Sequence, residues 1–335
     1  MTRHGHILLL LAAFVSETLS APRYDAVVAR DGSGTVRTIQ AALDLAPSRG
    51  AEPFIIFVKK GVYNEKLFVT KSNVALVGEH PDSTMIVFAE LRRDWNASMK
   101  GNDWGTAVVN IDSSVTDLTL MRLTVYNNYG ALSGVRDHQF AVWGKGTRII
   151  LQECRVVSEG GDALSLWNER NGMYYHAECR FEGWVDFVCP RGWCYITRSS
   201  FYGHNLTASL WHDGSADPDQ KFVIVDSRFD GVSGFPLGRH HRDGQFIFVN
   251  AVFSSAMADS AIAYPSYSPN ARPWTWGRRH YYHNCHREGG DFAWFADNFD
   301  RYPGGLTPDA VTPQWTFGGR WDPERTLRTI NERIR

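Results

Sequence analysis

An acidic residue interrupts an apolar stretch of the chain, and this contrast is the first indication of chemistry. The run "GWVDFVCPRGWC", residues 183–194, has the β-branched and aromatic character of a buried strand, and Asp186 lies within it. An ionised carboxylate is costly to bury, so this acid needs polar partners or a raised pKa. Asp162 lies 24 residues before Asp186, and Gln139 lies 23 residues before Asp162. Two acids and an amide at nearly equal spacing can act together if the chain itself repeats at that interval.

The elements that would position these residues do recur at a similar interval. Short apolar runs end in Val125, Val156, Phe181, Phe201, Phe229 and Phe253, at separations of 31, 25, 20, 28 and 24 residues. An imperfect period near 25 with short strands is typical of a solenoid. We therefore predict an all-β fold, a single-stranded right-handed parallel β-helix, in which residues one coil apart project from the same face. A β-sandwich is the alternative, but Asn, Ser and Cys at equivalent positions favour the solenoid because they can form ladders between coils.

The two ends of the chain differ from this repeat. The segment 38–47, "TIQAALDLAP", has its apolar residues on one face and predicts a short helix that ends at Pro47 and caps the N-terminal end of the solenoid. The end of the chain is rich in Trp, Pro and Arg and lacks a clear pattern. We expect this irregular segment to pack along the outside. No linker demands a second domain, so residues 21–335 are predicted to form one β-helix domain.

Residues 1–20 have the pattern of a secretory signal peptide. Arg3 precedes an apolar run at 7–15, and small residues including Ser20 lie before Ala21. The apolar run is too short to span a bilayer, although a buried N-terminal helix is an alternative. We expect an exported protein, extracellular or periplasmic, that carries no membrane anchor and acts as a monomer.

Charge and cysteine content restrict the partners. The net charge of −1 over 335 residues lacks the basic footprint of nucleic-acid binders, so no nucleic-acid partner is predicted. A polyanionic partner would need a local cationic cluster. Of the five cysteines, Cys189 and Cys194 are separated by four residues, which is not the usual spacing of a zinc pair. We favour thiols in the core, Cys154 and Cys179 among them, or one disulfide, and predict no metal and no cofactor.

Several segments, in order, resemble the pectin methylesterase (pectinesterase) family. The opening "DGSGTVRTIQAALDLAP" is followed by "IIFVKKGVYNEKLFV", "NVALVGE" and "GTAVVNI". Next come "QFAVWG", "GGDALSL", "GWVDFV" and "FPLGRHH", which are similar to the family's Gln-Ala-Val-Ala-Leu, Gln-Asp-Thr-Leu-Tyr, Gly-Thr-Val-Asp-Phe-Ile-Phe and Leu-Gly-Arg-Pro-Trp segments. The resemblance spans about residues 29–255. It implies the pectin lyase-like solenoid fold.

The resemblance also implies a reaction and a role for each motif residue. A family member removes methyl groups from methyl-esterified polygalacturonate and releases methanol, without a metal or organic cofactor. Asp186 would be the nucleophile, and Asp162 would protonate the departing methanol and then activate water. Gln139 would donate to the oxyanion, and Arg239 would orient Asp186 and keep it ionised. The physics agrees, because two acids in one cleft cannot both ionise cheaply and a guanidinium decides which one does.

Three departures from the family pattern affect the expected substrate contacts. Gly161 stands where the family has a second Gln, and a backbone N–H near it or Asn168 could replace that donor. "GRHH" replaces Gly-Arg-Pro-Trp, so His241 stands where a sugar-stacking tryptophan is usual, and Trp184 or Trp211 could supply the platform. "CPRGWC" follows Asp186 and contains Arg191, a candidate for contacting uronate carboxylates.

Two other functions stay open at this point. A polysaccharide lyase could use the same solenoid, and a calcium-dependent one would need clustered carboxylates. The dense candidate is "HDGSADPD", with Asp213, Asp217 and Asp219, which has the character of an exposed turn. A glycan-binding protein that lost catalysis through the Gly161 and His241 changes is the third possibility.

Overall fold

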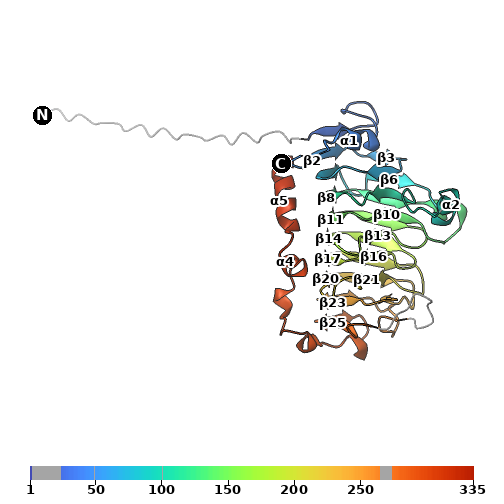
Figure 1. Cartoon of the computed structure of the whole chain (residues 1–335), viewed down its shortest axis with the longest axis vertical. Helices are drawn as coiled ribbons and strands as arrows, with labels where there is room; N and C mark the ends of the chain where they lie inside the picture. Colours follow the sequence, from blue (N-terminus) through green and yellow to red (C-terminus); the bar gives the residue numbers. More distant parts are fainter. Residues whose placement is uncertain (2–23, 49, 100, 265–273) are drawn as a thin grey trace.

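The strands of the chain stack into three long parallel sheets. The computed structural model describes residue 1 and residues 24–48, 50–99, 101–264 and 274–335. All strand pairs within the three sheets are parallel. The chain visits each sheet in turn as it climbs from coil to coil (Figure 1). The predicted all-β fold, a single-stranded parallel β-helix with right-handed crossovers, is confirmed.

The bounds of the strands are as follows, sheet by sheet. The ten-stranded sheet contains β1 (Ala26–Val28), β2 (Phe54–Val58), β5 (Val74–Gly78), β8 (Thr116–Met121), β11 (Thr147–Gln152), β14 (Met173–Ala177), β17 (Trp193–Thr197), β20 (Phe222–Val225), β23 (Gln245–Val249) and β25 (Arg279–His283). The nine-stranded sheet contains β3 (Gly61–Tyr63), β6 (Thr84–Phe88), β9 (Thr124–Asn127), β12 (Arg155–Ser158), β15 (Arg180–Gly183), β18 (Ser200–Gly203), β21 (Arg228–Gly231), β24 (Val252–Phe253) and β26 (His286–Arg287). The seven-stranded sheet contains β4 (Leu67–Val69), β7 (Ala107–Ile111), β10 (Phe140–Gly144), β13 (Leu164–Trp167), β16 (Val188–Arg191), β19 (Leu210–Trp211) and β22 (Gly238–Arg239).

The six run ends identified in the sequence occupy one row of the nine-stranded sheet. In register from coil to coil they are Val125, Val156, Phe181, Phe201, Phe229 and Phe253. All six side chains are buried, and the rings of Phe201 and Phe229 stack at 4.3 Å with an angle of 7° between their planes. The predicted repeat is therefore confirmed, and the row forms part of the apolar interior of the solenoid.

Polar ladders line the turns between the ten-stranded and nine-stranded sheets. The amide of Asn284 donates to Asn250 at 2.8 Å, and the amide of Asn250 donates to Asp226 at 2.7 Å. These residues have φ near +50°, a conformation that Asn and Asp tolerate better than most side chains. The next position of each turn includes Cys154 and Cys179, which are buried inside the solenoid as expected. All five cysteines are free thiols in the structure, so the alternative of one disulfide is wrong.

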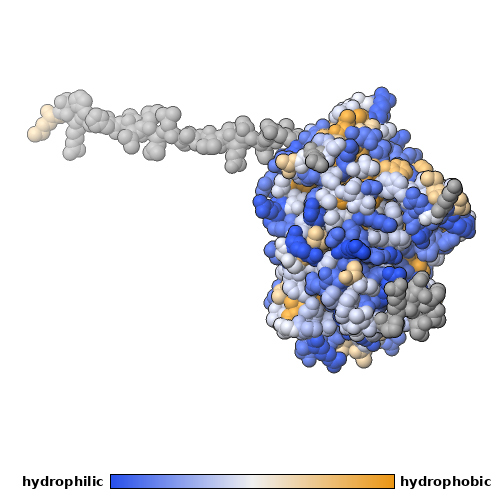
Figure 2. All heavy atoms as spheres, viewed as in Figure 1, coloured by the Kyte–Doolittle hydropathy of each residue, from blue (hydrophilic) through white to orange (hydrophobic). Residues whose placement is uncertain are grey.

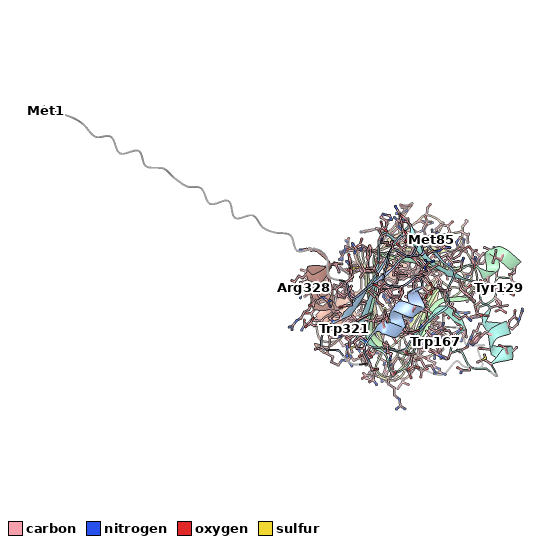
Figure 3. All side chains as sticks on the ribbon, turned by 90° about the horizontal axis from the view of Figure 1, so that it is seen from above. Met1, Met85, Tyr129, Trp167, Trp321 and Arg328 are labelled. Carbon is pink, nitrogen blue, oxygen red and sulfur yellow. The ribbon has the colours of Figure 1, made fainter. Side chains whose placement is uncertain are left out.

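A short helix closes the N-terminal end of the coil. Helix α1 (Ile39–Leu45) begins after Thr38, whose side chain accepts the N–H of Ala41, and it buries Ile39, Ala42 and Leu43. Seen from above, it lies across the end of the solenoid (Figure 3), as predicted. Helices α2 (Arg92–Ser98) and α3 (Tyr129–Ser133) instead project from one side, in the connections before β7 and β10.

The C-terminal segment packs along the outer face of the ten-stranded sheet. It contains the short 3₁₀ turns η1 (Ala293–Phe295), η2 (Phe299–Arg301) and η3 (Pro308–Ala310), then α4 (Pro313–Thr316) and α5 (Pro323–Ile334). Figure 1 shows α4 and α5 running back towards the N-terminal coils. Trp321 and Leu327 join a buried cluster with residues of that sheet. The expectation of an outer strap is confirmed, but its irregular character is wrong for α5, because Leu327 and Ile330 recur at the spacing of one helical face.

The surface and the first residues bear on whether the chain is exported. The face shown in Figure 2 is mostly hydrophilic, with apolar residues in small scattered groups. No helix within the described residues has the length and apolar character needed to cross a membrane. The predicted signal peptide, apart from Met1, lies outside the described residues.

Candidate active site

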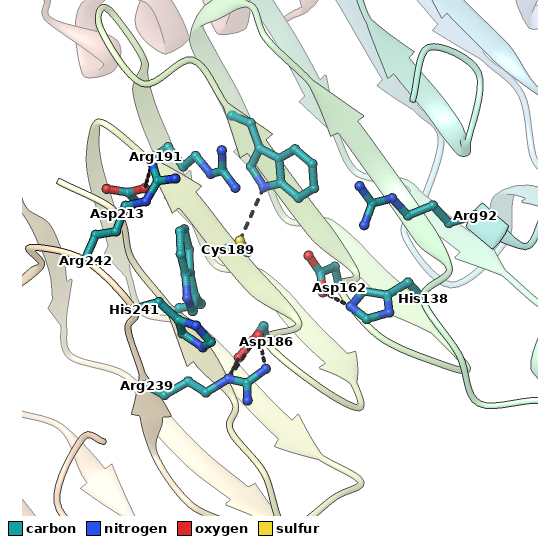
Figure 4. A pocket seen from close by; sticks show the side chains of 12 residues that line it. Arg92, His138, Asp162, Asp186, Cys189, Arg191, Asp213, Arg239, His241 and Arg242 are labelled. Atoms are coloured by element: carbon teal, nitrogen blue, oxygen red, sulfur yellow. Dashed lines mark hydrogen bonds and ion pairs between the residues drawn. The ribbon is translucent and has the colours of Figure 1, made fainter. Parts of the chain in front are cut away.

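A cleft of about 360 Å³ lies over the outer face of the seven-stranded sheet. It is lined by Arg92, His138, Asp162, Trp167, Asp186, Cys189, Arg191, Trp211, Asp213, Arg239, His241 and Arg242 (Figure 4). Most of these residues lie on or beside four consecutive strands, β13, β16, β19 and β22. Side chains alternate across a strand, so a row of outward positions on successive coils builds one continuous surface.

The two acids lie side by side at the start of neighbouring strands. Leu164 of β13 pairs with Val188 of β16, and the same register two residues earlier places Asp162 opposite Asp186. The N–H of Asp162 donates to the carbonyl of Val185 at 2.9 Å. Neighbouring strands lie about 4.8 Å apart. The predicted coil spacing therefore brings both acids to one face, as expected.

Asp186 is held in a strained backbone conformation and bound by Arg239. Its φ of 49° lies in the left-handed region, which costs free energy for a residue other than glycine. Nη2 of Arg239 donates to Oδ2 of Asp186 at 2.8 Å, and Nε donates to Oδ1 at 3.1 Å. Burial, with a smaller contribution from the charge of Asp162, raises the pKa of Asp186 to about 6, although the Arg239 hydrogen bonds oppose the increase. Asp186 is thus mainly ionised at neutral pH.

Asp162 is more deeply buried than Asp186, with 4% of its surface exposed against 8%. Oγ of Ser165 donates to its Oδ2 at 2.8 Å, while its Oδ1 has no hydrogen-bond partner among the described residues. Burial raises the pKa of Asp162, an effect that the charges of His138 and Arg92 and the Ser165 hydrogen bond oppose. Arg239 pairs with Asp186, so Asp186 is the acid that is favoured to ionise while the raised pKa of Asp162 favours its protonated form. The arrangement places an ionised carboxylate beside a protonated one.

Cations and indoles form the part of the cleft beyond the acids. The guanidinium of Arg191 lies 4.6 Å from the ring of Trp167 and 5.2 Å from the ring of Trp211, and it pairs with Glu169 at 2.6 Å. Arg242 lies 3.5 Å from Asp213. These contacts place cationic and stacking groups next to the two acids, and guanidinium and indole groups suit anionic and ring-shaped ligands. Of the predicted substrate contacts, Arg191, Trp211 and His241 line the cleft.

Two sequence-predicted residues do not reach the cleft. Gln139 is fully buried, its Oε1 accepts the N–H of Gly130 at 2.8 Å, and its Nε2 donates to the carbonyl of Val135 at 2.8 Å. The prediction that its amide faces the cleft is therefore wrong. Trp184 follows β15 in the turn before β16, where its ring stacks on His204 at 5.6 Å, so it is not among the residues that line the cleft.

Both suggested substitutes for the missing second glutamine are also engaged elsewhere. The N–H of Gly161 donates to the carbonyl of Asp137 at 3.3 Å. The side chain of Asn168 accepts the N–H of Asn171 at 3.0 Å in an exposed turn. Neither Gly161 nor Asn168 lines the cleft.

Sequence reasoning missed six residues that line the cleft. They are His138, Arg92, Trp167, Cys189, Asp213 and Arg242. Trp167 follows Asp162 by five residues and Cys189 follows Asp186 by three, so strict alternation from the acids would have placed both side chains inside the solenoid. Arg92 comes from α2 and is held by Asp103 through two hydrogen bonds of 2.8 Å, an arrangement without a local sequence signal.

The acidic segment considered for calcium does not form a cluster. Asp213 is 3% exposed and faces Arg242, which contradicts the expected exposed turn for this residue. Asp219 lies elsewhere and accepts hydrogen bonds from Lys221 and Trp193. Among the described residues, no three His, Cys, Asp or Glu side chains gather as a metal site would need.

Comparison with known proteins assigns the family. A family model described as Pectinesterase matches residues 25–208, which is more than half of the chain. The chain belongs to the pectinesterase family. A pectinesterase of Petunia integrifolia is 28% identical over 213 residues, which cover 62% of this chain and 53% of the relative. Pectinesterase A of Dickeya chrysanthemi is 36% identical over 124 residues, 36% of this chain and 33% of the relative. The chain thus spans about half or less of the length of these curated pectinesterases.

Solved structures of pectin methylesterases share the fold. The enzyme from carrot superposes with a TM-score of 0.72 at 19% identity, over 92% of this chain and 97% of that chain. A pectin methylesterase in complex with a hexasaccharide gives a TM-score of 0.68 at 22% identity, over 90% of this chain and 99% of that chain. The fold likeness therefore extends beyond residues 25–208, to which the family model is confined.

Proposed function

We propose that this chain hydrolyses the methyl esters of a pectin-type polygalacturonate and releases methanol. The observation that carries the proposal is the pairing of Asp186 with Arg239 beside the more deeply buried Asp162. An ionised and a protonated carboxyl next to each other can act as nucleophile and general acid in one reaction. Membership of the pectinesterase family supports the choice of a methyl-esterified uronate as substrate.

The reaction begins with attack by Asp186 on the ester carbonyl carbon. The carbonyl π electrons move to the oxygen, and the tetrahedral intermediate collapses as the bond to the methoxy oxygen breaks. Asp162 gives its proton to that oxygen, so methanol leaves and an anhydride between Asp186 and the uronate remains. A water molecule then attacks the anhydride while Asp162 takes its proton. The bond between the acyl carbon and Asp186 breaks, which restores the Asp186 carboxylate and leaves Asp162 protonated again. The uronic acid product leaves the cleft and loses its proton to the solvent as the free uronate.

Three groups support binding of the polymer near these acids. Trp211 offers an indole face on β19, and Arg191 offers a guanidinium fixed between Trp167 and Trp211. Burial, together with the charge of Arg239, lowers the pKa of His241, so its imidazole is neutral above mildly acidic pH and can exchange hydrogen bonds with sugar hydroxyls. Unesterified galacturonates are anionic, and an arginine suits a carboxylate because it can bind both oxygens.

Methanol release from highly methylated pectin tests the proposal. Asp186→Asn and Asp162→Asn should each lower turnover by at least about 10³-fold while the protein keeps its fold. Asp82→Asn changes an exposed aspartate outside the cleft and should retain wild-type turnover. Wild-type turnover by both cleft variants would refute the assigned roles.

The same incubation separates the other two functions. A lyase would produce unsaturated chain ends, which absorb ultraviolet light, without methanol. Binding to pectin without either product would favour a glycan-binding protein. Export of the chain through residues 1–20 is part of the proposal, and it predicts that the mature N-terminus begins near Ala21.

A further inference from the structure

The negative charge that develops on the carbonyl oxygen in the proposed reaction needs a donor, and neither expected amide supplies one. The amide of Gln139 is bonded to Gly130 and Val135 inside the protein. Residue 161 is a glycine, and its N–H is bonded to the carbonyl of Asp137. Losing one donor of this kind typically costs a factor of about 10²–10³ in rate. A competent cleft therefore needs a hydrogen-bond donor from another residue.

His138 lies in the space next to Gly161. A Cβ atom built on Gly161 would lie 3.2 Å from Cγ and Cδ2 of the His138 ring, closer than nearly all such contacts. The φ of Gly161 lies outside the positive range that favours glycine, so the backbone does not require this residue type. Glycine at 161 instead leaves room for the imidazole at the edge of the cleft.

Hydrogen bonding orients the His138 ring towards Asp162. Nδ1 of His138 lies 3.2 Å from Oδ1 of Asp137. Hydrogen bonds from the His138 backbone and ring lower the pKa of Asp137, so this carboxylate is ionised and Nδ1 carries the hydrogen. Nε2 therefore faces the cleft, 3.9 Å from Oδ1 of Asp162 (Figure 4).

The gap between His138 and Asp162 fits the two oxygens of one ester group. A separation of 3.9 Å is too long for a direct hydrogen bond, and Oδ1 of Asp162 has no hydrogen-bond partner within the described part of the chain. The two ester oxygens are bonded to the same carbon, so the carbonyl oxygen can lie about 2.8 Å from Nε2 while the methoxy oxygen lies about 2.8 Å from Oδ1. Two polar atoms at this separation are arranged for an ester group that arrives with the substrate.

We propose that His138 donates a hydrogen bond from Nε2 to the ester carbonyl oxygen as that oxygen becomes negative. This inference rests on the proposed ester hydrolysis. The donor holds its proton throughout: the electron pair stays on the carbonyl oxygen until the intermediate collapses, and the proton that leaves with methanol comes from Asp162. His138 thus takes the place of a side-chain amide and touches the reacting atoms.

The proposed donor is the imidazolium form of His138. Because Nδ1 donates its hydrogen to Asp137, Nε2 has a hydrogen to donate only when both ring nitrogens are protonated. The charged groups around the ring are Asp137 in the same turn, Asp162 before β13, Asp186 before β16 and Arg92 at the start of α2.

Kinetics of two substitutions at 138 test the role. His138→Ala should lower kcat by about 10²–10³-fold with little change in KM, because the lost contact forms only as charge develops. His138→Gln supplies a side-chain N–H donor, so it should recover at least tenfold of that loss. His80→Ala replaces an exposed histidine that also lies beside an aspartate, and it should leave kcat unchanged.

The outcomes separate this inference from the proposed function. Methanol release by the wild-type protein supports the function, and the ratio of variant to wild-type turnover tests the role of His138. A folded His138→Ala variant with kcat within twofold of wild type would overturn the role and leave the function standing. A folded His138→Gln variant that is no more active than His138→Ala would also overturn the role of His138 and leave the function standing. A wild-type protein that releases no methanol would overturn both.

A double substitution tests the competition for space between residues 138 and 161. Gly161→Gln should give at least a tenfold gain in the His138→Ala background, where the new amide has room near the cleft. In the wild-type background it should give no gain, because the Gln side chain meets the imidazole. Contacting residues are expected to show such non-additivity. Equal effects of Gly161→Gln in both backgrounds would contradict the proposed arrangement.

Discussion

Replacing Arg239 with glutamine should move the acidic limb of the pH–activity profile upwards. Arg239 donates hydrogen bonds of 2.8 and 3.1 Å to the two oxygens of Asp186, and it opposes the effect of burial, which raises the pKa of that acid to about 6. Hydrogen bonds to a charged group are worth about 1.5–3 kcal/mol. At 1.36 kcal/mol per pKa unit, their loss corresponds to an increase of about one to two units.

The acidic limb of Arg239→Gln should therefore lie near pH 7–8, given the wild-type value of about 6 for Asp186. Methanol release measured from pH 4.5 to 9.5 gives both limbs for each protein. Arg242→Gln is the matched control, because Arg242 lies in the same cleft but pairs with Asp213. Its acidic limb should stay at the wild-type position. An acidic limb that does not move in Arg239→Gln would refute the view that this pair keeps the nucleophile ionised.

Three further predictions concern stability and binding. Burial raises the pKa of Asp162, so the folded state holds this proton more tightly than the unfolded chain and the unfolding free energy falls as pH rises above about 4. Asparagine does not titrate, so Asp162→Asn should remove this fall in unfolding free energy. The Tm of the variant should exceed the wild-type Tm by little at pH 4 and by more at pH 7. Trp211→Ala should raise KM up to about tenfold with kcat nearly unchanged, since a lost stacking contact is worth about 0.5–1.5 kcal/mol. Phe201→Ala should cost about 3–5 kcal/mol in denaturant unfolding because its buried ring stacks on Phe229, whereas the neighbouring exposed Tyr202→Ala should cost far less.

The fold was predictable because its repeat is carried by single residues in register. Three successive coils carry a phenylalanine at the same position, namely Phe181, Phe201 and Phe229, and the structure aligns these residues on adjacent strands. The turn ladder was visible for the same reason, as Asn250 and Asn284 recur at one position of the coil. Helix α5 was not foreseen. Its apolar face is short and lies among Trp, Pro and Arg residues, and it is stabilised by packing on a sheet that is far away in the sequence.

The candidate site was predictable where coil spacing alone decides which residues meet. Asp162 and Asp186 lie at the same place on successive coils, and the structure puts them side by side. The choice between His138 and Gln139 depends on a finer variable. Both residues lie in the connection between α3 and β10, where the alternation of a strand does not apply, so the path of that connection decides which side chain meets the cleft. The sequence contains no signal for that path, and a motif match selects the amide. The hydrogen bonds of Gln139 to Gly130 and Val135 reverse that choice.

The roles of the two acids depend on a residue from a later coil. Asp162 and Asp186 begin neighbouring strands in matching register, and burial raises the pKa of both, so their own strands leave the roles unassigned. Arg239 breaks the symmetry. It lies on β22, two strands beyond β16 in the same sheet, and its side chain reaches back across β19 to Asp186. The proposed nucleophile is therefore selected only once the coils through β22 are stacked. A chain that ends before β22 would lack the group that favours the charge of Asp186, so the proposed ester hydrolysis requires the later coils.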